Sequence, residues 1–96
     1  MKVEYSKRAV SDLDQIAAYH ATSGEAAAGE KTATAIRERV TRITEAPLFG
    51  RAITQRPGVR LILLVRYRYK IFYRVVGTTA RIIHIRHMSR RPWPPA

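Results

Sequence analysis

The side chains of this chain that could do chemistry lie mainly in its second half, where arginines alternate with tyrosines and histidines. No cysteine occurs, which excludes a cysteine nucleophile and thiolate metal ligands. Metal-free RNA cleavage needs a base for the 2′-hydroxyl, an acid for the leaving oxygen and cations for the phosphate. Residues of these types are Arg60, Arg66, Tyr73, Arg81 and His87. An inert basic sheet would show the same residue types, so both interpretations stay open.

The positions of the carboxylates disfavour a metal-dependent nuclease. Such enzymes hold their ions with carboxylates, and the second half of the chain contains no Asp or Glu. The ligands would have to be Glu4, Asp12 or Asp14 from the first half. His84 and His87 lie three apart in a predicted strand, so they point to opposite faces and cannot share one metal ion. We expect neither a metal site nor a cofactor.

The net charge of +11 is confined to one half of the chain. Residues 1–45 carry 7 Lys and Arg and 7 acidic residues, whereas residues 46–96 carry 11 Lys and Arg and no acid. Such one-sided charge indicates an anionic partner, which is nucleic acid, an acidic protein segment or, less favoured, an anionic membrane surface. The longest apolar run, Leu61 to Val65, is too short for a membrane span, and the N-terminus lacks a signal-peptide core. We expect a cytoplasmic protein without a membrane partner.

Hydrophobic periodicity predicts a single domain of residues 1–96 with the element order β-α-α-β-β-β. The predicted elements are a strand at 1–5, helices at 7–23 and 25–46, and strands at 59–65, 67–76 and 80–87. Ser6 offers an N-cap, and Gly24 leaves so short a connection that the two helices must form an antiparallel hairpin. Residues 47–58 contain two Pro and two Gly and predict an irregular loop. The expected fold is α+β, with the long hairpin packed on one face of a small, mainly antiparallel sheet.

The predicted strand within Val65–Gly77 has an aromatic face and a cationic face. Its two faces are Tyr67, Tyr69, Ile71, Tyr73 and Val75 on one side, and Arg66, Arg68, Lys70 and Arg74 on the other. We expect the aromatic face to pack on the helices. Phe72 and Val76 interrupt the cationic face, which indicates partial cover by the loop at 47–58. Alternatively, the tyrosines could stack on nucleic-acid bases.

The order and spacing of these patterns resemble the RelE/ParE superfamily of toxins from type II toxin–antitoxin modules, over nearly the whole chain. The patterns are A..DL..I..Y at Ala9, Asp12, Leu13, Ile16 and Tyr19; EAPLFGR with Pro47 and Gly50; Arg60; YRYKIFYRV; and ARIIHIRHMSRR. The ParE branch, which the long hairpin resembles, comprises proteins similar to inhibitors of DNA gyrase. The RelE branch comprises ribosome-dependent mRNA endonucleases with clusters of Lys and Arg and a C-terminal Tyr.

The ParE branch is the better match, because no Tyr follows Tyr73 and Lys70 is the sole Lys after Lys31. We therefore predict a non-enzymatic inhibitor of gyrase. The alternative is a metal-free endonuclease that cuts mRNA on the ribosome, and a non-catalytic RNA-binding domain is the third interpretation.

The resemblance also implies a hetero-oligomer with a ParD-like antitoxin, whose acidic and apolar C-terminal segment folds on binding. The candidate antitoxin contacts are Leu13, Ile16, Ile36, Val40, Arg60, Arg68 and Arg74. The basic C-terminal tail is the candidate contact with the target, through Arg86, Arg90, Arg91 and Trp93.

Overall fold

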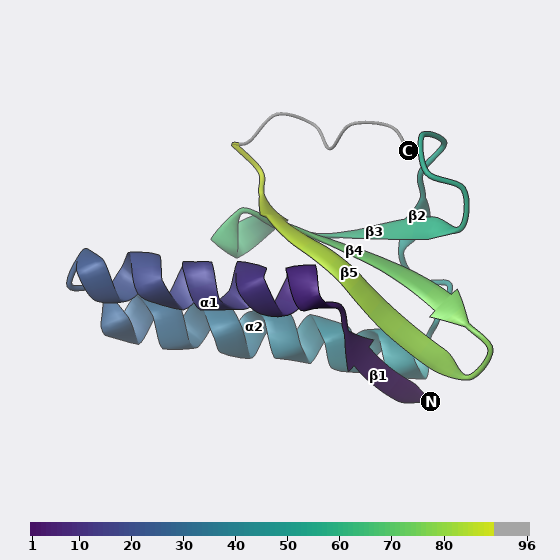
Figure 1. Ribbon diagram of the computed structural model, residues 1–96, viewed down its shortest axis with the longest axis horizontal. Helices are drawn as coiled ribbons and strands as arrows, with labels where there is room; N and C mark the ends of the chain where they lie inside the picture. The colour runs from purple at the N-terminus through teal and green to yellow at the C-terminus, as the bar shows by residue number, and fades with distance from the viewer. Residues whose placement is uncertain (90–96) are drawn as a thin grey trace.

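The predicted α+β architecture is present in the computed structural model, which describes residues 1–89 (Figure 1). Its elements are β1 (Lys2–Tyr5), α1 (Lys7–Thr22), α2 (Ala26–Glu45), β2 (Arg51–Ala52), β3 (Val59–Leu64), the 3-10 turn η1 (Val65–Tyr67), β4 (Tyr69–Val76) and β5 (Thr79–His87). Figure 1 shows α1 and α2 as an antiparallel hairpin lying along one face of the sheet. Neither helix in the described part of the chain is long and apolar enough to cross a membrane.

The sheet has five strands in the order β1-β5-β4-β3-β2. Only β1 pairs in parallel, with β5, and the other neighbours are antiparallel. The sequence predicted a sheet of four strands. The structure adds a fifth strand, β2, within residues 47–58, which were predicted to be an irregular loop. Arg51 pairs with Leu61, and Ala52 pairs with Arg60. Two paired residues leave too little periodicity for the strand to be visible in a sequence rich in Pro and Gly.

Side-chain capping fixes where α1 begins. The hydroxyl of Ser6 accepts a hydrogen bond from the backbone N–H of Ala9 (3.0 Å) and donates one to the carbonyl of Ile83 (2.9 Å). The predicted N-cap is thus confirmed, and the same side chain ties the start of the helix to β5. At the other end of α1, Gly24 adopts φ +75° and reverses the chain into α2.

The core lies between the hairpin and the sheet. Its buried members are Ala9, Ile16, Ile36, Val40, Ile43, Ile62, Leu64, Ile71, Tyr73, Ala80, Ile82 and Ile85. The aromatic face of β4 packs on this cluster as predicted, with Tyr69 and Val75 at its margin. A second, smaller cluster on the opposite face joins Val59, Leu61 and Phe72, and Ile53 from the loop covers it. The predicted partial cover is confirmed for Phe72 but is wrong for Val76, which is 56% exposed.

Two irregularities correct the predicted strand pattern. Val65 to Tyr67 form a 3-10 turn followed by Arg68 at φ +62°, so β4 begins at Tyr69. The second irregularity is a bulge in β5. Phe72 of β4 pairs with His84, but the next residue of β4, Tyr73, pairs with Ile82, so Ile83 is left as an extra residue. The bulge shifts the alternation of β5. Ile85 and His87 therefore lie on the helical face, whereas Arg81 and Ile83 lie on the opposite face.

Candidate functional site

Half of β3 is left without a neighbour on one side. Its first residues pair with β2 through Arg60 and Leu61, but Ile62 to Leu64 pair only with β4 within the described residues. An exposed strand edge presents unpaired backbone N–H and C=O groups and can accept an additional strand. Leu63 is exposed beside this edge, and so is Phe49 from the loop before β2. The edge therefore offers both backbone hydrogen bonds and apolar anchors.

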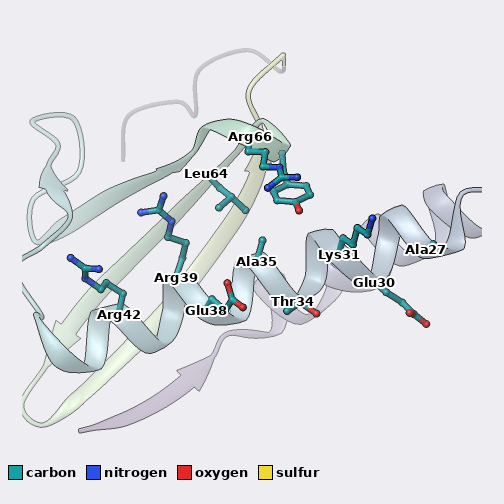
Figure 2. Close-up of a pocket in the computed structure, with 11 residues that line it drawn as sticks. Ala27, Glu30, Lys31, Thr34, Ala35, Glu38, Arg39, Arg42, Leu64 and Arg66 are labelled. Carbon is teal, nitrogen blue, oxygen red and sulfur yellow. The ribbon is translucent and has the colours of Figure 1, made fainter.

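A groove of about 770 Å³, here called the edge groove, runs between α2 and this end of the sheet (Figure 2). It is lined by Ala27, Glu30, Lys31, Thr34, Ala35, Glu38, Arg39, Arg42, Leu64, Arg66 and Tyr67. Figure 2 shows Arg39 and Arg42 projecting from the side of α2 that faces Leu64, while Glu30 points away. A smaller hollow of about 260 Å³ joins Arg39 and Phe49 to Leu61, Ile62 and Leu63.

The cations of the edge groove are available to a partner. Among residues 1–89, Lys31, Arg39 and Arg66 have no ion pair. The guanidinium of Arg42 lies 5.2 Å from the centre of the Phe49 ring, and that of Arg66 lies 5.6 Å from the Tyr67 ring. Unpaired guanidinium groups beside an open strand edge suit an extended peptide that carries carboxylates.

The candidate antitoxin contacts on the helices prove to be core residues. Ile36 and Val40 are 0% and 3% exposed, Ile16 is buried, and the partly buried Leu13 packs against the same core. The structure places these side chains in the core between the helices and the sheet and not on the surface, because the sheet covers the apolar stripe of each helix. The polar flank of α2 that lines the edge groove carries the half-buried Arg39 and the exposed Arg42.

The candidate cations on the sheet do not form one surface either. Arg68 is exposed at the turn before β4, and Arg74 is exposed on the face opposite the helices. Arg60 points into the fold, where its Nη1 atom donates to the carbonyl of Gly50 (2.7 Å) and more weakly to that of Leu48 (3.4 Å).

Arg60 is one of four residues, here called the latch, whose hydrogen bonds join the loop after α2 to the sheet. The other three are Pro47, Gly50 and Tyr73. The hydroxyl of Tyr73 donates to the carbonyl of Pro47 and accepts from the backbone N–H of Gly50, each at 2.8 Å. The Tyr73 side chain is 0% exposed. A Cβ atom on Gly50 would lie 2.5 Å from the Tyr73 ring, so the contact requires glycine. The latch gives Pro47, Gly50 and Arg60 a shared role, which is to hold the loop after α2 against the sheet.

The five residues named for metal-free RNA cleavage are dispersed by this arrangement. Tyr73 and Arg60 are engaged in the latch, and Arg81 lies on the opposite face, paired across strands with Arg74. Only Arg66 and His87 line a common groove, of about 660 Å³. The described residues contain no group of three or more His, Cys, Asp or Glu side chains that could hold a metal ion.

Sequence reasoning missed the pair formed by the partly buried Asp12 and the buried His84. Oδ2 of Asp12 accepts from the backbone N–H of Ile85 (2.9 Å) and from Nδ1 of His84 (2.7 Å). Nη1 of Arg86 lies 3.4 Å from the other ring nitrogen of His84, and because a guanidinium group can only donate, this contact favours the neutral ring. Burial lowers the pKa of His84, against the opposing effect of Asp12. Because β1 ends at Tyr5, Asp12 occupies the place of a missing neighbour strand beside β5.

Of the candidate target contacts, only Arg86 lies in the described part of the chain. It is half-buried in β5 and is paired across strands with Lys70. Arg90, Arg91 and Trp93 lie outside the described residues.

Comparison with known proteins agrees with the fold and the motifs. The profile of the ParE toxin of the type II toxin–antitoxin system parDE matches residues 3–92. The chain is similar to a protein of the chromosomal ParDE toxin–antitoxin system from P. aeruginosa, with a TM-score of 0.78 and 24% identity over 93% of this chain and 97% of that one.

Two structures from E. coli are also similar to the chain. One comes from the intact RelBE toxin–antitoxin complex (TM-score 0.71, 14% identity, 93% of this chain and 98% of that one). The other is the isolated RelE toxin (TM-score 0.68, 14% identity, 94% and 86%). At these identities the structures show a shared fold. No curated protein matches the chain significantly. Because the family profile covers almost all of the sequence, the chain belongs to the ParE toxin family of type II toxin–antitoxin systems.

Proposed function

We propose that this ParE-type toxin is held inactive by an antitoxin segment that adds a strand to β3 at Ile62–Leu64 and lies along the edge groove. The unpaired backbone edge, with unpaired cations beside it, is the observation that supports this binding mode. Main-chain hydrogen bonds to the edge would supply affinity, and side chains in the groove would supply specificity.

The groove favours a segment that is both acidic and apolar. Carboxylates would pair with Arg39 and Arg42 in the edge groove, while apolar side chains would cover Leu63 and Phe49 in the adjoining smaller hollow, each of which is 42% exposed. A disordered segment needs such anchors because it loses conformational entropy when it folds on the toxin. Binding should therefore weaken only moderately with salt, and a collapse of affinity in molar salt would contradict an apolar contribution.

Amide hydrogen exchange tests where the antitoxin binds. When the antitoxin encoded beside this toxin is added, amides of Ile62–Leu64 that point away from β4 should become protected. Replacing both Arg39 and Arg42 by Glu should weaken binding at least about tenfold, since two charge-assisted contacts turn repulsive. Arg37→Glu is the matched control on the exposed surface of α2 outside the edge groove. Protection confined to the face opposite the helices would contradict the proposed site.

We propose that DNA gyrase is the target of the free toxin. The dispersal of the five RNA-cleavage candidates supports a non-enzymatic mode, because the hydroxyl of Tyr73 is already used by Pro47 and Gly50 and is inaccessible to substrate. The basic segment that begins at Arg86 and continues through Arg90 to Trp93 is the proposed contact. Arginines can pair there with acidic protein or with phosphate, and the Trp can anchor the contact.

Truncation separates target binding from antitoxin binding. Deleting residues 90–96 should abolish toxicity in cells while leaving the fold and the antitoxin complex intact, because the latch and the edge groove lie within residues 1–89. His87→Ala should reduce toxicity only slightly. If toxicity survives the truncation but is lost in His87→Ala together with cleavage of ribosome-bound mRNA, the endonuclease alternative is correct.

A further inference from the structure

A second groove lies at the far end of the hairpin, adjoins the edge groove through the shared residues Lys31, Arg66 and Tyr67, and takes no part in the latch. This His87 groove has a volume of about 660 Å³ and includes Tyr19, Lys31, Arg66, Arg68, Tyr69 and His87. A volume of this size suits a small organic ligand. We propose that the His87 groove binds a nucleotide, through phosphate contacts to its cations and stacking of the base on its tyrosines. The proposal is independent of the target of the toxin.

The charges around the groove favour a phosphate. Within residues 1–89, Lys31, Arg66 and Arg68 have no ion pair. The acidic side chain among the described lining residues is Asp12, whose Oδ2 atom is already engaged by Ile85 and His84. Three uncompensated cations at one opening bind a multiply charged oxyanion better than a single carboxylate.

His87 adds a donor of defined position. The backbone N–H of Ser89 donates to Nδ1 of His87 at 3.1 Å, so the neutral ring carries its proton on Nε2. Nε2 has no hydrogen-bond partner among the described residues. The Tyr69 ring meets the His87 ring edge to face, with 5.1 Å between their centres, and so fixes its orientation. The imidazole can therefore present an N–H group to a phosphate oxygen.

The aromatic lining favours a base beside that phosphate. Tyr19 is 67% exposed at the end of α1, and its ring lies edge to face against His20, with 5.3 Å between the centres. Tyr67 and Tyr69 line the same groove from the sheet. Stacking of a base on an aromatic side chain is worth about 1–3 kcal/mol and does not depend on which base is bound.

Titration of the full-length, 15N-labelled protein tests the proposal in low-salt buffer. AMP should bind saturably and shift the amide signals of Arg66, Arg68 and His87. Lys31→Ala should weaken AMP binding about tenfold, the usual loss for a charge-assisted contact. Tyr19→Ala should weaken AMP binding by a similar factor but leave inorganic phosphate binding unchanged. Both substitutions are at exposed helical positions, where Ala preserves the helix. Arg37→Ala, on α2 but outside the groove, should behave as wild type.

A second ligand distinguishes whether the groove binds a free nucleotide or a nucleotide within single-stranded nucleic acid. A 5′-phosphorylated single-stranded tetranucleotide that competes with AMP and binds more tightly identifies single-stranded nucleic acid. Equal or weaker binding identifies a free nucleotide. The proposal is overturned if AMP does not saturate, if Lys31→Ala and Tyr19→Ala match Arg37→Ala, or if an acidic peptide occupies the groove and AMP does not.

Discussion

Replacing Gly50 by Ala should destabilise the protein strongly, although it adds only one methyl group. The new Cβ atom would lie 2.5 Å from Cε1 of Tyr73 and 2.7 Å from its hydroxyl oxygen. Real side chains do not approach so closely, so either the Tyr73 ring or the loop must move. Because Tyr73 is fully buried beneath the loop, movement breaks its hydrogen bonds to Pro47 and Gly50.

The magnitude follows from two contributions. Overpacking a tightly packed position costs about 1–3 kcal/mol. A buried polar group left without its partner costs about 1–3 kcal/mol more. The free energy of unfolding should therefore fall by roughly 2–6 kcal/mol, out of roughly 5–15 kcal/mol for a typical domain. For a domain of this length, each kcal/mol lowers Tm by about 4–8 °C.

Urea denaturation of Gly50→Ala, Tyr73→Phe and the double variant measures these contributions separately. Tyr73→Phe removes the hydroxyl and should cost about 1–3 kcal/mol by itself. In the double variant the contact with the hydroxyl oxygen is absent, so the combined loss should be smaller than the sum of the two single losses. A loss below about 1 kcal/mol for Gly50→Ala would refute the latch.

Three further predictions concern the links between α1 and β5. Ser6→Ala should lower the free energy of unfolding by about 1–2 kcal/mol in urea denaturation, since its hydroxyl makes two hydrogen bonds, and no measurable change would contradict the cap. Asp12→Asn should cost about 1–3 kcal/mol in the same assay, whereas Asp14→Asn, at an exposed position, should be nearly neutral; equal effects would contradict the edge contact. Because burial lowers the pKa of His84, the unfolded chain takes up the proton first, so stability should fall as pH drops below the ordinary value of 6.5. His84→Gln should flatten this pH dependence, and an unchanged profile would contradict the assignment.

The helical hairpin and the two faces of β4 were predictable because the spacing of apolar residues along a helix or strand follows which of its side chains are buried. Ile36 and Val40 lie on the stripe that the sequence predicts, and they are buried. The same burial makes them supports of the fold in this structure, since the sheet covers the stripe. The open edge of β3 at Ile62–Leu64 could not be predicted, because it depends on β2 pairing with only two residues of β3.

The roles of single polar residues depended on distant contacts that no local pattern encodes. Tyr73 has the same spacing as its aromatic neighbours in β4, yet its hydroxyl is committed to a loop 23 residues away at Gly50. His84 meets Asp12 only because a bulge shifts β5 and β1 stops early. The A..DL pattern that contains Asp12 was the available signal, but a pattern does not reveal which backbone the carboxylate caps.

Supercoiling by purified gyrase tests the central claim most directly, with ribosome-programmed mRNA cleavage run beside it on the same protein. The toxin should inhibit supercoiling, its antitoxin should relieve the inhibition, and mRNA on ribosomes should remain intact. Unaffected gyrase together with specific mRNA cuts that vanish in His87→Ala would contradict gyrase as the target.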